Sequence, residues 1–132
     1  MVSLSFSSCN KDKDRKVSNS ERLIGEWIYR TTQEKTNGEW KDMPTQVGAE
    51  GAQTFYKDGK ALITMTFKGE YMEQKFEWNL KDNNDYIING TVRGQILFES
   101  NDCFYLYSDE TLDPETGGNI KGEFRDIYDR KK

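Results

Sequence analysis

Leu23-Ile24-Gly25-Glu26-Trp27 opens the stretch that decides the fold of this chain. Trp27 and Tyr29 share one face of a predicted first strand over residues 25–35, because successive side chains of a strand point to opposite faces. The rest of the chain alternates between short apolar runs and turn signals. The stretch therefore predicts the first strand of a small all-β domain.

Turn signals divide the remaining sequence into short strands. Asn37-Gly38 and Asp58-Gly59 are strong hairpin signals, because these residues tolerate the positive φ that tight hairpin turns require. We expect Trp40 on a short segment paired across the first turn. Together with the polar turns, the apolar runs predict further strands over residues 53–56, 61–67, 71–80, 86–89, 91–99, 103–108 and 120–128.

These elements predict one domain over residues 19–132. Roughly eight strands joined by hairpin-length links favour an antiparallel up-and-down β-barrel, whose closure removes exposed strand edges. A short helical turn that ends at Leu23, capped by Asn19 or Ser20, precedes the first strand.

Two of the predicted strands carry a face pattern. In residues 71–80, alternation predicts a strand that is half buried and half solvated. Its apolar face holds Met72, Gln74, Phe76, Trp78 and Leu80, and its charged face, which includes Glu73 and Glu77, is expected to lie outside. In residues 91–99 the pattern places Val92, Ile96 and Phe98 on one side.

Composition excludes several classes of function. The chain has no histidine, which excludes Ser-His and Cys-His catalysis and imidazole zinc sites. Its net charge of −4 argues against nucleic-acid binding. We expect a protein that is not an enzyme and has no metal and no cofactor. We interpret the acidic loop over residues 109–119 as a solvated hairpin loop and Cys103 as a buried small residue.

The N-terminal residues suggest a membrane anchor. Ser7-Ser8-Cys9-Asn10 follows a short apolar stretch and precedes a charged run, which resembles the end of a bacterial lipoprotein signal and its tether. Residues 1–18 are thus interpreted as a truncated signal and a disordered tether, with Cys9 as the lipidated residue. The resemblance implies a protein anchored to a membrane in the cell envelope of a Gram-negative bacterium. The alternative is a disordered polar tail with an incidental cysteine.

Residues 20–129 resemble the lipocalin-like domains of the calycin superfamily, in particular those of small bacterial lipoproteins. The Gly25-Glu26-Trp27 motif, the strand meander and the Ser-Ser-Cys-Asn segment carry this resemblance. It implies that Trp27 closes one end of the barrel and that an arginine of the last strand lies across it. Arg125 is the candidate for that arginine. The function that the resemblance implies is binding of small apolar molecules.

The predicted ligand site is the barrel interior. The residues expected to line it are Met65, Met72, Gln74, Phe76, Trp78, Phe98 and Tyr105. The same aromatic residues could instead fill the interior, because an eight-stranded barrel has room only for side chains or one small ligand. The alternative function is a cell-envelope interaction module with a packed barrel, which binds protein or glycan through its rim and loops, including Trp40. We expect a monomer.

Overall fold

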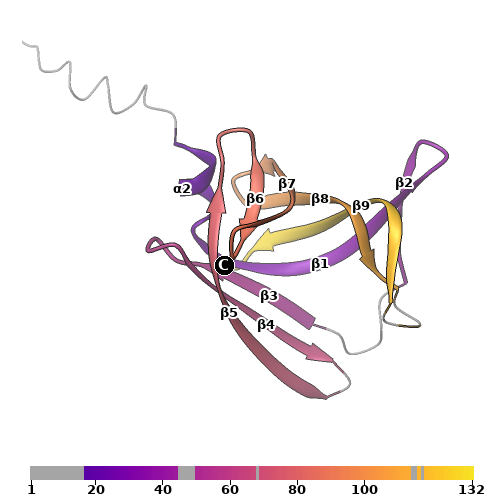
Figure 1. The fold of residues 1–132 in the computed structure, drawn as a ribbon, viewed down its shortest axis with the longest axis horizontal. Coiled ribbons are helices and arrows are strands. Elements are labelled where there is room, and N and C mark those ends of the chain that lie inside the picture. The colour runs from indigo at the N-terminus through magenta and orange to yellow at the C-terminus, as the bar shows by residue number, and fades with distance from the viewer. Residues whose placement is uncertain (1–16, 45–49, 68, 114–115, 117) are drawn as a thin grey trace, which may run out of the picture.

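The computed structural model describes residues 17–44, 50–67, 69–113, 116 and 118–132. This part of the chain forms one short helix and nine strands (Figure 1). Their bounds are α2 Asn19–Leu23, β1 Gly25–Thr36, β2 Glu39–Asp42, β3 Glu50–Phe55, β4 Lys60–Phe67, β5 Glu70–Leu80, β6 Asp85–Ile88, β7 Thr91–Ser100, β8 Cys103–Leu112 and β9 Asn119–Arg130. No helix within these residues is long and apolar enough to cross a bilayer.

The strands close into a barrel. Neighbours follow the order β1-β3-β4-β5-β6-β7-β8-β9, every pair is antiparallel, and β9 pairs back with β1. β2 pairs only with the far half of β1, so it lies beside the barrel and eight strands form the wall. This confirms the predicted eight-stranded up-and-down barrel, and Trp40 lies on the short paired segment, as predicted.

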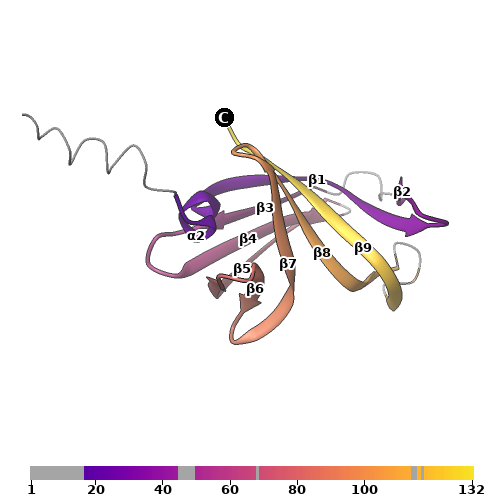
Figure 2. The ribbon, with the colours of Figure 1, turned by 90° about the horizontal axis from the view of Figure 1, so that it is seen from above.

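One end of the barrel is closed by aromatic side chains and by α2. Trp27 is completely buried, and its indole packs edge-on against Phe104 with ring centroids 4.7 Å apart. Its Nε1–H donates to the carbonyl of Leu23, 2.8 Å away, so the end of α2 is tied to the core. The indole thus lies in the core at this end of the barrel, and its role as the barrel floor stays a prediction. α2 and β2 lie at opposite ends of the molecule (Figure 2).

The helical turn begins one residue earlier than the sequence indicated. Ser18, rather than Asn19 or Ser20, is the N-cap, and it forms a capping box with Glu21. The side chains of Asn19 and Ser20 instead bind other elements: Asn19 donates to Asn84 and Ser20 to the carbonyl of Leu80. These bonds hold α2 against the end of β5.

The arginine across Trp27 is Arg130, not Arg125. The Arg130 guanidinium carbon lies 4.2 Å from the Trp27 ring, and its nitrogens donate to the carbonyls of Arg22 and Ile24 at 2.7 and 3.1 Å. The prediction was wrong because β9 continues to Arg130, whereas the sequence pattern ended it at Tyr128. Gly25 makes room for this arginine, since a Cβ there would lie 2.9 Å from the guanidinium at a φ of +128°.

Candidate functional site

The barrel is open at the end away from Trp27. Met65 and Met72 are register partners on the inner face, in phase with the buried Ala61 and its partly buried partner Phe76. Their side chains are nevertheless 45% and 53% exposed. Inner-facing side chains can be exposed only where solvent reaches the inside of the barrel, so the inner face of this half is solvent-accessible.

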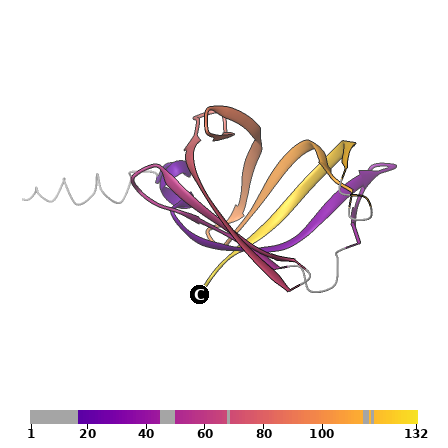
Figure 3. The same ribbon diagram turned by 60° about the horizontal axis from the view of Figure 1, so that its bottom comes forward.

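The shortness of β6 explains this opening. β5 pairs with β6 only at Trp78, Asn79 and Leu80, so its first half has β4 as its single neighbour among the described strands. The β3–β4–β5 wall thus faces the β8–β9 wall across the barrel (Figure 3). Alternation of burial in β5 consequently begins only at Phe76. The predicted burial of one face along all of residues 71–80 is therefore wrong for its first half.

We call this solvent-accessible part of the inner face the open half of the barrel. Its inner-facing residues come from two opposite walls, and each has solvent access. They are Thr32 and Glu34 of β1, Met65 of β4, Met72 and Gln74 of β5, and Asp126 of β9.

A chain of polar groups runs along the β1–β9 wall. The Tyr29 hydroxyl lies 2.5 Å from Thr32 Oγ1, and Thr32 Oγ1 lies 2.6 Å from Asp126 Oδ1. A carboxylate can only accept, so Thr32 donates to Asp126 and Tyr29 donates to Thr32. The Asp126 side chain is partly buried. Burial raises the pKa of its carboxyl, and the Thr32 hydrogen bond partly opposes that rise.

A second polar group separates the open half from the aromatic core. Gln53 is 6% exposed, receives a hydrogen bond from the Tyr86 hydroxyl at 2.8 Å and donates to the Tyr128 hydroxyl at 2.6 Å. Burial raises the pKa of both tyrosines. The amide and both hydroxyl groups each have at least one hydrogen-bond partner within this cluster. The cluster therefore forms an ordered base beneath the open half.

The structure places six of the seven predicted lining residues at two levels of the barrel. Met65, Met72 and Gln74 line the open half. Phe76, Trp78 and Phe98 are partly buried and pack against the core beneath it, where Trp78 lies 5.3 Å from Phe55. Whether any of them binds a ligand stays a prediction.

Tyr105 lies outside the barrel, which corrects its predicted position. It is the register partner of Leu97 and Ile127, whereas the neighbouring Phe104 faces the core. Its hydroxyl bonds Glu99, and the Arg125 guanidinium lies over its ring at 4.5 Å. The error arose because apolar and aromatic residues occupy both faces of β8, so alternation does not single out the inner one.

The polar groups of the β1–β9 wall were not predicted as site residues. Asp126 alternates in phase with Phe124 and Tyr128, so an acidic residue on an otherwise aromatic face was the signal that could have found it. Thr32 has no comparable signal, because a β-bulge between Tyr29 and Thr31 changes the face on which it lies.

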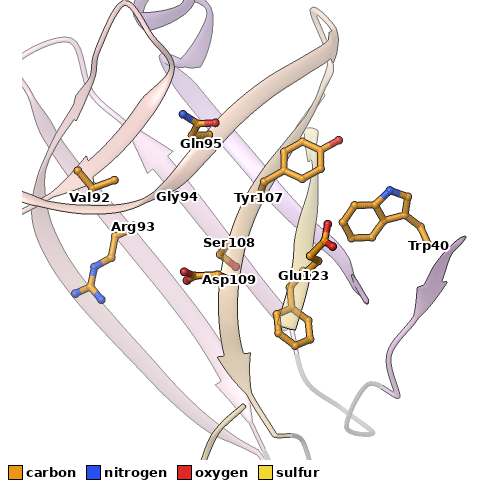
Figure 4. A pocket seen from close by; sticks show the side chains of 10 residues that line it. Trp40, Val92, Arg93, Gly94, Gln95, Tyr107, Ser108, Asp109 and Glu123 are labelled. Atoms are coloured by element: carbon orange, nitrogen blue, oxygen red, sulfur yellow. The ribbon is translucent and has the colours of Figure 1, made fainter. Parts of the chain in front are cut away.

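A side pocket of about 470 Å³ lies where β7 leaves β8 (Figure 4). Gly94 and Gln95 of β7 face Tyr107 and Ser108 of β8 there, and Trp40 lies on its outer side. Three charged residues also line it, namely Arg93, Asp109 and Glu123. None of these three forms an ion pair within the described residues.

Trp40 is half-buried in a stack on the outer surface. The Arg125 guanidinium lies 4.3 Å from its ring and 4.5 Å from the ring of Tyr105, so it is sandwiched between the two aromatics. Tyr107 meets Trp40 edge-on, with ring centroids 5.8 Å apart. Arg125 thus orders the outer surface instead of the barrel floor.

The fold was compared with those of solved structures. The fold is similar to that of the odorant-binding protein from bovine nasal mucosa, with 14% sequence identity and a TM-score of 0.46. The alignment covers 89% of this chain and 77% of that one. No family model and no curated protein matches the sequence.

Proposed function

We propose that this protein is a noncatalytic binder of a small, mostly apolar ligand, which it holds in the open half of the barrel. The observation that carries this proposal is the exposure of Met65 and Met72 on the inner face. Methionine is flexible and polarisable, so two exposed methionines form an adaptable apolar wall. Covering them with an apolar ligand would remove that surface from water.

The residues of the chain support a noncatalytic role. The sequence has no histidine to serve as a general base. Burial raises the pKa of the Cys103 thiol, which disfavours the thiolate that a nucleophile requires, and the Arg30 guanidinium only partly offsets this. Cys103 is also the register partner of Asp129 and lies on the opposite face from Phe104, away from the interior.

A pair of adjacent substitutions tests the site. Met72 and Tyr71 are neighbours on β5, both exposed, on opposite faces. We expect the neutral dye N-phenyl-1-naphthylamine to fluoresce on binding to the wild type. Met72→Glu should weaken binding at least about tenfold by placing a charge on the apolar wall, and Tyr71→Glu should leave it unchanged. Equal effects of both substitutions, or no dye binding to the wild type, would reject the proposal.

We further propose that the protein is a lipid-anchored monomer of the Gram-negative cell envelope. The support is the Ser7-Ser8-Cys9-Asn10 segment. Cys9 and residues 1–16 lie outside the described residues. In the native host, metabolic labelling with an alkyne-tagged palmitate should mark the protein, and Cys9→Ala should abolish the label. A label that survives this substitution would exclude Cys9 as the anchor.

The side pocket supports a second candidate function, the binding of a glycan at the rim. Its unpaired Asp109 and Glu123 carboxylates can accept hydrogen bonds from hydroxyl groups, and Trp40 supplies an aromatic border. A glycan array with the wild type and an Asp109→Asn, Glu123→Gln double variant tests this. Signals of equal strength for the two proteins would reject a glycan site in this pocket.

A further inference from the structure

One carboxylate oxygen in the open half has no protein partner. Thr32 bonds Asp126 Oδ1 and is the single hydrogen-bond partner of that side chain within the described residues. Oδ2 therefore has unused acceptor capacity. A carboxylate has room for about four hydrogen bonds, so Oδ2 can accept hydrogen bonds from a molecule bound in the solvent-accessible open half.

Among the residues that the structure describes, no basic side chain forms an ion pair with Asp126. Its pKa is shifted by burial and by Thr32, with no contribution from a basic side chain. Glu34, the next inner-facing residue of β1 towards the opening, is also acidic. The Arg93 guanidinium partly opposes the rise in the pKa of Tyr86 and is not a cause of the shift at Asp126. The β1–β9 wall is thus acidic, whereas Met65 and Met72 of the opposite wall are apolar.

From this geometry we infer that the ligand is an amphiphilic amine, with its ammonium group on Asp126 Oδ2 and its apolar body against Met65 and Met72. An ammonium supplies both the missing hydrogen-bond donors and the missing positive charge. Thr32, held by Tyr29, fixes the carboxylate from the other side. The inference rests on the proposed function, because it names the ligand class of the same open half of the barrel.

Three ligands of equal chain length test this inference: n-octylamine, n-octanol and octanoate. Each competes with N-phenyl-1-naphthylamine for the wild type at pH 7. We expect octylamine to displace the dye at a concentration about tenfold lower than octanol, as for a charge-assisted hydrogen bond, and octanoate to be the weakest. Asp126→Asn, which preserves shape, should reduce the amine preference to less than about twofold without changing displacement by octanol.

Two control variants locate the effect. Glu123→Gln removes an unpaired carboxylate from the outer side of the same strand and should leave the amine preference intact. Glu34→Gln removes the neighbouring inner-facing carboxylate and should reduce the preference less than Asp126→Asn does. Loss of the preference in Glu34→Gln but not in Asp126→Asn would overturn the assignment to Asp126.

The outcomes separate this inference from the proposed function. If dye and octanol bind but octylamine shows no preference, or if the preference survives Asp126→Asn, the ligand class is wrong and the binding function stands. If octanoate binds best, the carboxyl group acts as a donor and the amine assignment is likewise overturned. If neither dye nor octanol binds, the proposed function itself fails.

Discussion

Trp27 is held by contacts on several sides of its ring. Phe104 packs against it, Arg130 lies over it, and its nitrogen is bonded to the carbonyl of Leu23. Truncating it would leave a large cavity and free this arginine. We expect Trp27→Ala to lower the free energy of unfolding by about 3–5 kcal/mol, measured by urea denaturation.

Trp40 provides the matched control for this substitution. It also stacks with an arginine, Arg125, but it is half-buried on the outer surface. Trp40→Ala should lower the free energy of unfolding by about 1 kcal/mol or less. Similar losses from both substitutions would show that Trp27 does not close the barrel.

Asp126 makes the stability of the protein depend on pH. Its pKa is raised in the folded state, so the folded protein binds this proton more tightly than the unfolded chain does. Its contribution is thus most favourable below the ordinary value of 3.8 and is lost as the pH rises through the folded-state pKa. We therefore expect Asp126→Asn to unfold at higher urea concentration than the wild type at pH 7.

The same substitution has a built-in control. Between pH 7 and pH 3 the stability difference between Asp126→Asn and the wild type should shrink, because the wild-type carboxyl becomes protonated. Glu123→Gln should show no such convergence. A variant that is less stable than the wild type at pH 7 would contradict the view that the buried carboxylate is under-solvated.

At the scale of single elements, β7 depends on Gly94. This residue has a φ of +155°, and a Cβ on it would lie 2.1 Å from the carbonyl oxygen of Tyr107. Gly94 is also the register partner of Tyr86, next to the β-bulge at which β7 shifts its pairing with β6. We expect Gly94→Ala to cost more than about 2 kcal/mol of unfolding free energy, because backbone must move.

Gly90 is the appropriate comparison for Gly94. It also has a positive φ, +81°, but a Cβ added to it would meet no atom within 4 Å. Gly90→Ala should therefore cost only about 1–2 kcal/mol, the strain of the left-handed conformation alone. Equal losses at both positions, measured by urea denaturation, would contradict the close approach of β7 and β8.

The strands were predictable where turn chemistry marks their ends. Asn37-Gly38 and Asp58-Gly59 have the positive φ that their hairpin turns require at Asn37, Gly38 and Gly59. Bulges and strand ends were less predictable, because a residue of a given type can either continue the pairing of two strands or end it. Val92 illustrates this: the bulge in β7 leaves it 54% exposed, away from the buried Ile96 with which alternation had grouped it.

At the scale of the whole molecule, the barrel is closed in topology but unevenly supported. The first half of β5 pairs with β4 alone and is exposed on both faces within the described structure, whereas Trp78–Leu80 pairs with β6 and ends at the buried Leu80. We expect fast amide hydrogen exchange at residues 71–75 and slow exchange at residues 78–80, measured by mass spectrometry or NMR at pH 7. Equal protection of the two segments would show that something covers the first half of β5 in solution.

The sequence indicated the barrel but not this asymmetry. Alternation in residues 71–80 correctly groups Met72 with Phe76, because both follow from the period of a strand. Exposure depends on how far β6 extends along β5, which is a long-range property. The sequence therefore predicts which residues share the inner face of this strand, but it does not predict that part of this face is exposed to solvent.

The four-residue length of β6 also bears on what the protein can accommodate. From Glu70 to Phe76, no inter-strand ladder joins β5 to β6 within the described residues, so at this edge the two walls can separate without breaking backbone hydrogen bonds between these strands. Ligands of different width can then bind in the same barrel while its aromatic core stays rigid. The specificity of binding would then depend on the polar head group of the ligand more than on the width of its apolar part.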